Sequence, residues 1–204
     1  MMIAVIDYNV GNLMSVTNAL KRIGLDPIVT RNHDVIREAK GIILPGVGTF
    51  PVAMENLEKF DLIDILNERK EAGVPILGIC LGMQILFEKG SEVRETAGLG
   101  FLKGSVDKMV VDAKIPHMGW NELFFNKDHS LLKNIKEKDY VYFVHSFMAN
   151  GIDDELIAYC EYGNSKVTAM VAKDNVMGCQ FHPEKSGEVG KKILEAFKEM
   201  VECC

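Results

Sequence analysis

The sequence predicts an α/β fold with a mixed, mostly parallel central sheet flanked by helices and an antiparallel C-terminal extension. Two observations support this prediction. Through residue 80, short apolar runs typical of buried strands alternate with segments of helical spacing. Beyond Gly100, closely spaced strand-like runs are separated by Gly, Asn and Asp, and an amphipathic segment follows them. The first half should therefore be doubly wound and the second largely antiparallel.

The first half contains four apolar runs with the composition of buried strands. They cover residues 2–6, 27–29, 41–44 and 76–79. Apolar residues at helical spacing predict one helix over residues 13–23 and a second over residues 57–70. Helix-compatible residues follow Cys80 from Leu81 to Phe87, so we expect a further helix directly after the fourth strand.

The second half is expected to contain five strands and one closing helix. The strands cover residues 106–111, 140–144, 156–159, 167–171 and 176–181. The helix covers residues 188–201, with Val189, Ile193, Phe197 and Met200 on one face and Lys and Glu on the other. That apolar face should pack on the sheet.

Composition agrees with a compact, soluble protein of one domain, because 204 residues, 48% hydrophobic and 25% charged, can bury one sizeable core. The net charge of −6 and the lack of a Lys/Arg-rich block argue against nucleic acid as a partner. The chain shows no signal peptide and no apolar run long enough to span a membrane, so we expect a cytoplasmic protein. Its five cysteines have neither a disulfide pattern nor metal-ligand spacing, and no metal or nucleotide cofactor is expected.

Cys80 is the candidate nucleophile. It lies in Gly78-Ile79-Cys80-Leu81-Gly82, between a strand and a helix, and glycines at these positions permit the tight turn that exposes a nucleophile above a sheet. The helix would direct its N-terminus at the sulfur, favouring a thiolate, and the Leu81 N–H could help to hold an oxyanion. Considered alone, Cys80 is more simply explained as a buried core cysteine.

His182 and Glu184 favour a catalytic role for Cys80 over a structural one. They flank Pro183, which favours an extended path, so both side chains can project from the same side of the chain. A base oriented by a carboxylate and brought within reach of a cysteine is the general arrangement of an activated nucleophile. The sequence therefore predicts a catalytic triad of Cys80, His182 and Glu184.

The two segments Gly78–Gln84 and Phe181–Ser186 resemble those of class I, triad-type glutamine amidotransferases. The segment Leu44-Pro45-Gly46-Val47-Gly48 is similar to the loop that forms the oxyanion hole in that family. The resemblance implies a flavodoxin-like fold, a glutaminase activity that proceeds through a cysteine thioester, and an oxyanion hole built by the backbone at Gly46, Val47 and Leu81. Without the resemblance, this loop would be read as an ordinary turn after a buried strand.

Three further segments, 7–12, 116–121 and 142–147, resemble the glutaminase subunits of imidazole glycerol phosphate synthases, so the resemblance extends through nearly the whole chain. It implies that the substrate is L-glutamine and that the partner is a (β/α)8-barrel cyclase subunit. That subunit uses the ammonia to form imidazole glycerol phosphate and an aminoimidazole carboxamide ribotide in histidine biosynthesis. Candidates for the face that meets the cyclase are Asn12, His117, Met118, Trp120 and Tyr142.

Glutamine recognition is also implied by the resemblance. Gln84 and Glu92 match family positions that contact glutamine, and Glu92 could pair with its α-ammonium group. The segment His145-Ser146-Phe147 resembles the strand whose backbone meets the α-carboxylate. The same segment, with a buried and hydrogen-bonded histidine, would also suit an ordinary core strand.

Three alternatives remain open on the sequence. A free-standing cysteine hydrolase would use the same triad without a partner protein. A glutaminase subunit of another synthase, such as that for anthranilate or guanylate, would deliver ammonia to a different acceptor. A non-catalytic binding module is the third, although it would not require an intact triad.

Overall fold

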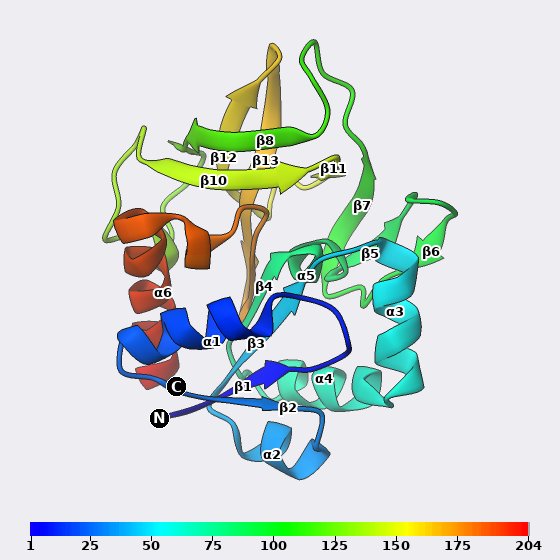
Figure 1. The fold of residues 1–204 in the computed structure, drawn as a ribbon, viewed down its shortest axis with the longest axis vertical. Coiled ribbons are helices and arrows are strands. Elements are labelled where there is room, and N and C mark those ends of the chain that lie inside the picture. The colour runs from blue at the N-terminus through cyan, green and yellow to red at the C-terminus, as the bar shows by residue number, and fades with distance from the viewer. Residues whose placement is uncertain (204) are drawn as a thin grey trace.

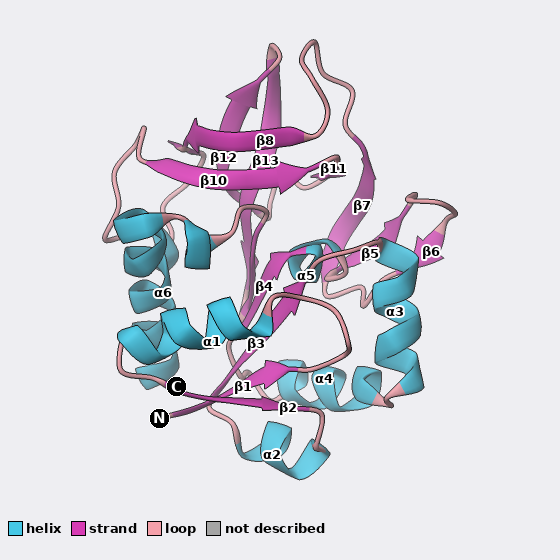
Figure 2. Ribbon diagram, in the orientation of Figure 1, coloured by secondary structure: helices cyan, strands magenta, loops and turns pink. Residues whose placement is uncertain are grey.

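The computed structural model describes residues 1–203, and its largest element is a sheet of eight strands (Figures 1 and 2). Five adjacent strands are mutually parallel and the last three are antiparallel. In spatial order the strands are β2 (Asp26–Thr30), β1 (Met2–Ile6), β3 (Gly41–Gly46), β4 (Ile76–Cys80), β14 (Val176–Cys179), β13 (Ser165–Lys173), β12 (Leu156–Tyr162) and β9 (Phe124–Phe125). This is the mixed, mostly parallel sheet that the sequence predicts.

Helices cover both faces of the parallel strands, because these strands are apolar on both sides (Figure 2). Along β1, Ile3 and Val5 belong to the core under α1 (Leu13–Arg22) and α6 (Gly187–Glu202). The alternating residues Ala4 and Ile6 face the opposite core. That second core is covered by α2 (His33–Glu38), α3 (Phe50–Lys59), α4 (Leu62–Glu71) and the short helix α5 (Leu81–Gln84).

Two smaller sheets complete the second half of the chain. The strands β8 (His117–Glu122) and β10 (Tyr140–His145) form an antiparallel pair that crosses over β12 and β13 in Figure 1. The other sheet is arranged in the order β11 (Phe147–Asn150), β7 (Leu102–Lys108), β5 (Phe87–Gly90) and β6 (Thr96–Ala97). Of two short 3₁₀ helices, η1 (Ser130–Leu132) lies between β9 and β10 in the chain, and η2 (Pro183–Lys185) lies between β14 and α6.

Several elements differ from the sequence-based prediction. The predicted helix over 57–70 is two helices, because the chain turns at Phe60 and at Asp61, which adopts a left-handed conformation. The helix after Cys80 ends at Gln84, and Phe87 already belongs to β5. Strand β7 begins and ends earlier than the predicted 106–111, and the second half is not entirely antiparallel, since β14 pairs in parallel with β4 and β7 with β5.

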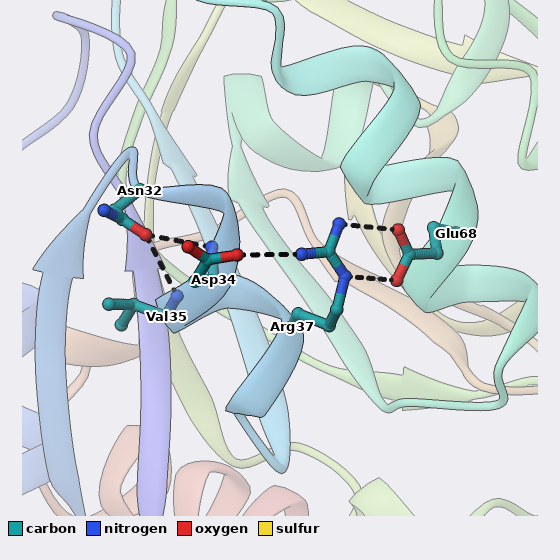
Figure 3. Close-up of polar contacts among 5 residues, drawn as sticks. All are labelled: Asn32, Asp34, Val35, Arg37 and Glu68. Carbon is teal, nitrogen blue, oxygen red and sulfur yellow. Dashed lines mark hydrogen bonds and ion pairs between the residues drawn. The ribbon is translucent and has the colours of Figure 1, made fainter.

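Helix α2 was not predicted, and local polar contacts explain why so short a helix forms (Figure 3). The Asn32 side chain accepts hydrogen bonds from the N–H groups of Asp34 and Val35, at 2.9 and 3.2 Å, which caps the helix N-terminus. Arg37 then makes a two-pronged ion pair with Glu68 of α4, at 2.9 and 3.0 Å. These contacts fix α2 against α4 at the end of the molecule opposite β8 and β10.

The carboxyl ends of three neighbouring strands place the candidate site. Strand β3 ends at Gly46, β4 at Cys80 and β14 at Cys179, and Gly46 lies opposite Cys80 in the parallel register. The loop after β3, the turn after β4 and the segment leading to His182 therefore emerge together at one edge of the sheet. This is the edge at which open α/β sheets form their ligand clefts.

Candidate active site

Cys80 occupies a strained turn between β4 and α5. Its backbone angles, φ 56° and ψ −112°, lie outside the regions that residues with a side chain ordinarily adopt, at a cost of about 1–3 kcal/mol. The neighbouring glycines make this turn possible: a Cβ at Gly78 would lie 2.5 Å from the Gly82 carbonyl oxygen, and one at Gly82 would lie 1.7 Å from that of Leu44. The sequence therefore predicts the strand-to-helix turn correctly, and its glycines are required by close backbone approach.

His182 is held by Glu184 and directed at Cys80. His182 Nδ1 lies 2.8 Å from Glu184 Oε1, and the two side chains are only 3% and 1% exposed. Burial lowers the pKa of His182, but its interactions with the Cys80 and Glu184 side chains raise it more, to about 9. His182 Nε2 is buried and has no hydrogen-bond partner among residues 1–203, so it is free to act on a ligand. The arrangement can hold an imidazolium beside a thiolate.

The segment that carries His182 is fixed to strand β10. The His182 N–H donates to the Tyr142 carbonyl and the Tyr142 N–H donates to Ser186 Oγ, both at 3.0 Å. The same Ser186 hydroxyl donates to the His182 carbonyl at 2.6 Å. Ser186 therefore closes the turn through Pro183 that brings Glu184 back onto the histidine ring.

A cavity of about 350 Å³ lies between these groups, a volume within the range of small-molecule sites. Most of the residues that the sequence singled out meet here. The cavity is lined by Val47, Gly48, Cys80, Leu81, Gln84, Glu92, Pro116, Val144, His145, Ser146, Phe147 and His182. Of the predicted oxyanion residues, Val47 and Leu81 line the cavity, whereas Gly46 is not among its lining residues and pairs with Cys80 between β3 and β4.

Gln84 is buried, and its amide nitrogen is already engaged. Gln84 Nε2 donates to the Phe147 carbonyl at 3.2 Å and to Gln180 Oε1 at 3.0 Å. Its amide oxygen is therefore the atom with which it could receive a donor from a ligand.

Gln180 is a residue that the sequence-based reasoning missed. It is fully buried, and its Nε2 lies 3.8 Å from Cys80 Sγ, within the longer hydrogen-bonding range of sulfur. The only available sequence signal was a polar amide inside the apolar run that leads to His182. Together with Gln84, it connects Cys80 to the Phe147 carbonyl at the cavity wall.

Glu92 lines the cavity and also caps a helix. Its Oε2 accepts a hydrogen bond from the Phe50 N–H at 2.8 Å, at the start of α3, where the Thr49 side chain makes no cap bond. One carboxylate therefore connects the cavity wall to the end of the loop that follows Gly46.

His145 and His117 form a buried, uncharged pair. His145 Nδ1 donates to the Phe147 carbonyl at 2.8 Å, so its Nε2 must accept from His117 Nδ1 at 3.1 Å. Burial lowers the pKa of each to about 4. This result corrects the placement of His117: it is 2% exposed and stacked between Phe143 and Tyr162, so it supports the surface from below and does not form part of it.

The comparison with protein families decides which kind of enzyme this site belongs to. The model of the family described as glutamine amidotransferase class-I matches residues 4–200. This chain is a class-I glutamine amidotransferase. It is 56% identical over 199 residues to imidazole glycerol phosphate synthase subunit HisH of Lactococcus lactis, with 98% of each chain covered. It is 50% identical over 203 residues to the subunit HisH of Caldanaerobacter subterraneus, with 99% of this chain and 100% of the relative covered.

Solved structures support the fold of the amidotransferase at lower sequence identity. A crystal structure of a glutamine amidotransferase superposes with a TM-score of 0.77 at 19% identity, and the PurLQS structure from Thermotoga maritima with 0.76 at 23%. In both cases 98% of each chain is covered. The resemblance to the class I amidotransferase fold, predicted from the sequence, is confirmed.

One exposed surface of the amidotransferase adjoins the cavity. On the β8–β10 pair, alternate side chains point outward and form what we call the aromatic face, which consists of Met118, Trp120, Tyr140 and Tyr142. Met118 and Trp120 are 60% and 55% exposed, and the Trp120 and Tyr142 rings meet edge to face at 6.1 Å. Val144 is the next residue along β10 whose side chain points outward, and it lines the cavity.

Asn12, the other predicted interface residue, is exposed and caps α1 by accepting a hydrogen bond from the Ser15 N–H at 3.3 Å.

Within residues 1–203, no helix has the length and apolarity needed to cross a membrane, and no group of three or more His, Cys, Asp or Glu side chains could hold a metal. Cys80, Cys160, Cys179 and Cys203 are free thiols in the amidotransferase; Cys204 lies outside the described residues.

Proposed function

We propose that the amidotransferase is the glutaminase subunit of an imidazole glycerol phosphate synthase in histidine biosynthesis. The observation that supports this most strongly is that three strand ends bring Cys80, His182 and the Gly46–Gly48 loop around one cavity, in a chain that matches HisH subunits along nearly its whole length. We place it in the cytoplasm, where its free thiols would stay reduced.

Catalysis begins when the Cys80 thiolate attacks the side-chain amide carbon of glutamine. The carbonyl oxygen becomes an oxyanion, which the Leu81 N–H and the backbone at Gly46 and Val47 receive. His182, protonated and held by Glu184, donates a proton through Nε2 to the departing nitrogen. Ammonia leaves and a γ-glutamyl thioester remains on the sulfur.

Hydrolysis of the thioester completes the cycle. His182, now neutral, takes a proton from water, and the resulting hydroxide attacks the thioester carbon. The same backbone donors stabilise the second oxyanion, and its collapse releases glutamate and the Cys80 thiolate. In the bound substrate, Glu92 pairs with the α-ammonium group, the Gln84 amide oxygen accepts from the ligand, and the backbone at His145, Ser146 and Phe147 receives the α-carboxylate. All five residues line the cavity.

The ammonia is delivered to a (β/α)8-barrel cyclase subunit that docks on the aromatic face. Trp120 and Met118 provide large exposed apolar side chains of the kind that anchor protein interfaces. The cavity reaches the inner end of this face through Val144 and Pro116. A partner seated there would cover the exit from the cavity, so that ammonia passes to its acceptor without entering the solvent.

Glutamate release by the purified chain tests this function. It is measured with and without the cyclase subunit and its nucleotide ligand, and Cys80→Ala is the control. We expect weak activity alone, strong stimulation by the liganded partner, and none above background in Cys80→Ala. Equal activity without the partner would indicate a free-standing hydrolase. No activity in any mixture would indicate a subunit of another synthase.

A further inference from the structure

Tyr8 is a buried polar residue that the mechanism above does not use. It follows β1, is fully buried, and its hydroxyl donates a 2.6 Å hydrogen bond to the carbonyl oxygen of Pro45, 37 residues away. Burial raises the pKa of Tyr8 far above its ordinary value, and the nearby Cys80 adds a smaller effect in the same direction. The hydroxyl therefore keeps its proton and remains a donor. Tyr8 is not among the residues that line the cavity.

The position of this bond matters because Pro45 directly precedes Gly46, the first residue whose backbone is expected to form the oxyanion hole. The Pro45 carbonyl and the Gly46 N–H belong to one planar, trans peptide group, so a bond that fixes the oxygen also fixes the direction of the N–H. The hydroxyl lies close to the loop itself, since a Cβ added at Gly46 would lie 2.8 Å from Tyr8 Oη. Gly46 in turn lies beside Cys80.

The other end of the loop is held as well. The Phe50 N–H is bonded to Glu92, so residues 46–49 lie between two fixed points. Between them the chain is less constrained: Val47 is 44% exposed, and Gly48 has a positive φ of 119° with open space where a Cβ would stand. Any reorientation of the loop must therefore occur in the peptide groups after Gly46.

We propose that Tyr8 is a positioning residue of the oxyanion hole: its hydroxyl fixes the Pro45–Gly46 peptide group, so that only the following peptides turn to meet the developing charge. This inference rests on the proposed glutaminase function. It assigns Tyr8 an effect on the transition state and none on the binding of glutamine. Loss of the bond would let the first peptide of the loop rotate and misalign the backbone donors.

Tyr8→Phe tests this role, since it keeps the ring and removes only the hydroxyl. In the complex with the cyclase and its ligand, we expect kcat for glutamine hydrolysis to fall about tenfold, less than the hundredfold or more for the loss of a whole oxyanion donor. KM should stay within twofold. Alkylation of Cys80 by iodoacetamide, which forms no oxyanion, should also stay within twofold. Tyr159→Phe is the matched control, because the Tyr159 side chain stacks on Phe124, and we expect no change in it.

Three results would reject the role of Tyr8. An unchanged kcat would show that the hydroxyl does not support the transition state. A parallel fall in kcat, alkylation rate and melting temperature, or failure of the variant to fold, would make the bond a general structural one. An unmodified chain that releases no glutamate in the complex would reject the proposed function and this role together, whereas an active chain with an equally active Tyr8→Phe would reject only the role.

Discussion

Glu184 affects the proposed reaction only through His182. Its Oε1 holds His182 Nδ1, and its charge is one of the two that keep the histidine pKa raised. A protonated His182 is what the departing nitrogen requires, so activity should be lost as the pH rises through the histidine pKa. The carboxylate therefore sets the upper end of the working pH range.

Glu184→Gln should move that limit to lower pH. The amide keeps the shape and a hydrogen-bonding oxygen but removes the charge. The effect of burial, which lowers the His182 pKa, is then no longer counteracted by the charge of Glu184. We expect the alkaline limb of kcat for glutamine hydrolysis to shift down by about one pH unit or more, a loss of about 1.4 kcal/mol of imidazolium stabilisation. Glu188→Gln, which removes an 82% exposed charge on α6, should leave the profile unchanged. Identical profiles in both variants would contradict this role of Glu184.

The sequence predicts the geometry around the candidate site where the contact is local. His182 and Glu184 are two positions apart, and the turn at Cys80 depends on glycines two positions away on either side. Gln180 and Tyr8 could not be found in this way, because their bonds reach residues 96 and 37 positions distant. Their roles depend on which strands are neighbours, and a single sequence does not show that.

At the scale of elements, the turn at Cys80 depends on how closely α5 approaches β3. Helix α5 has four residues, so little of its stability comes from its own hydrogen bonds. It is instead fixed by backbone contact at Gly82, where a Cβ would lie 1.7 Å from the Leu44 carbonyl oxygen. The helix ends earlier than its apolar residues suggest, because β5 already begins at Phe87.

Gly82→Ala should therefore destabilise the amidotransferase strongly. Its methyl group would meet backbone that cannot move without shifting β3, so we expect a loss of about 3 kcal/mol or more in the free energy of unfolding. Gly41→Ala, at the other end of β3, is the matched control: the three atoms nearest to its methyl would be side-chain atoms of Val201 and Ile3, at 2.8 Å or more, so that we expect a smaller loss. Urea denaturation measures both. Equal losses of unfolding free energy in the two variants would show that the close approach of α5 to β3 does not determine the need for glycine at position 82.

At the scale of the whole molecule, the chain divides into a part that holds the candidate triad and a part that borders the cavity. The eight-stranded sheet places Cys80 and His182, and β10 connects this site to the aromatic face, since its Tyr142 backbone holds the His182 turn. The sequence predicted Met118, Trp120 and Tyr142 as partner contacts from resemblance alone. It could not show that His117 lies beneath them, because the strand alternation of β8 was not predicted.

Trp120 should anchor the cyclase subunit, because it is the largest exposed side chain on the aromatic face and packs on Tyr142. We expect Trp120→Ala to weaken the complex by about 2 kcal/mol, roughly a thirtyfold rise in Kd by calorimetric titration. The melting temperature of the free chain should change little, since the side chain is already 55% exposed. Val29→Ala on the edge strand β2, at the far end of the molecule in Figure 1, should leave Kd unchanged. If both variants bound the cyclase as the unmodified chain does, the partner would have to dock elsewhere, and the cavity exit through Val144 and Pro116 would no longer lie under it.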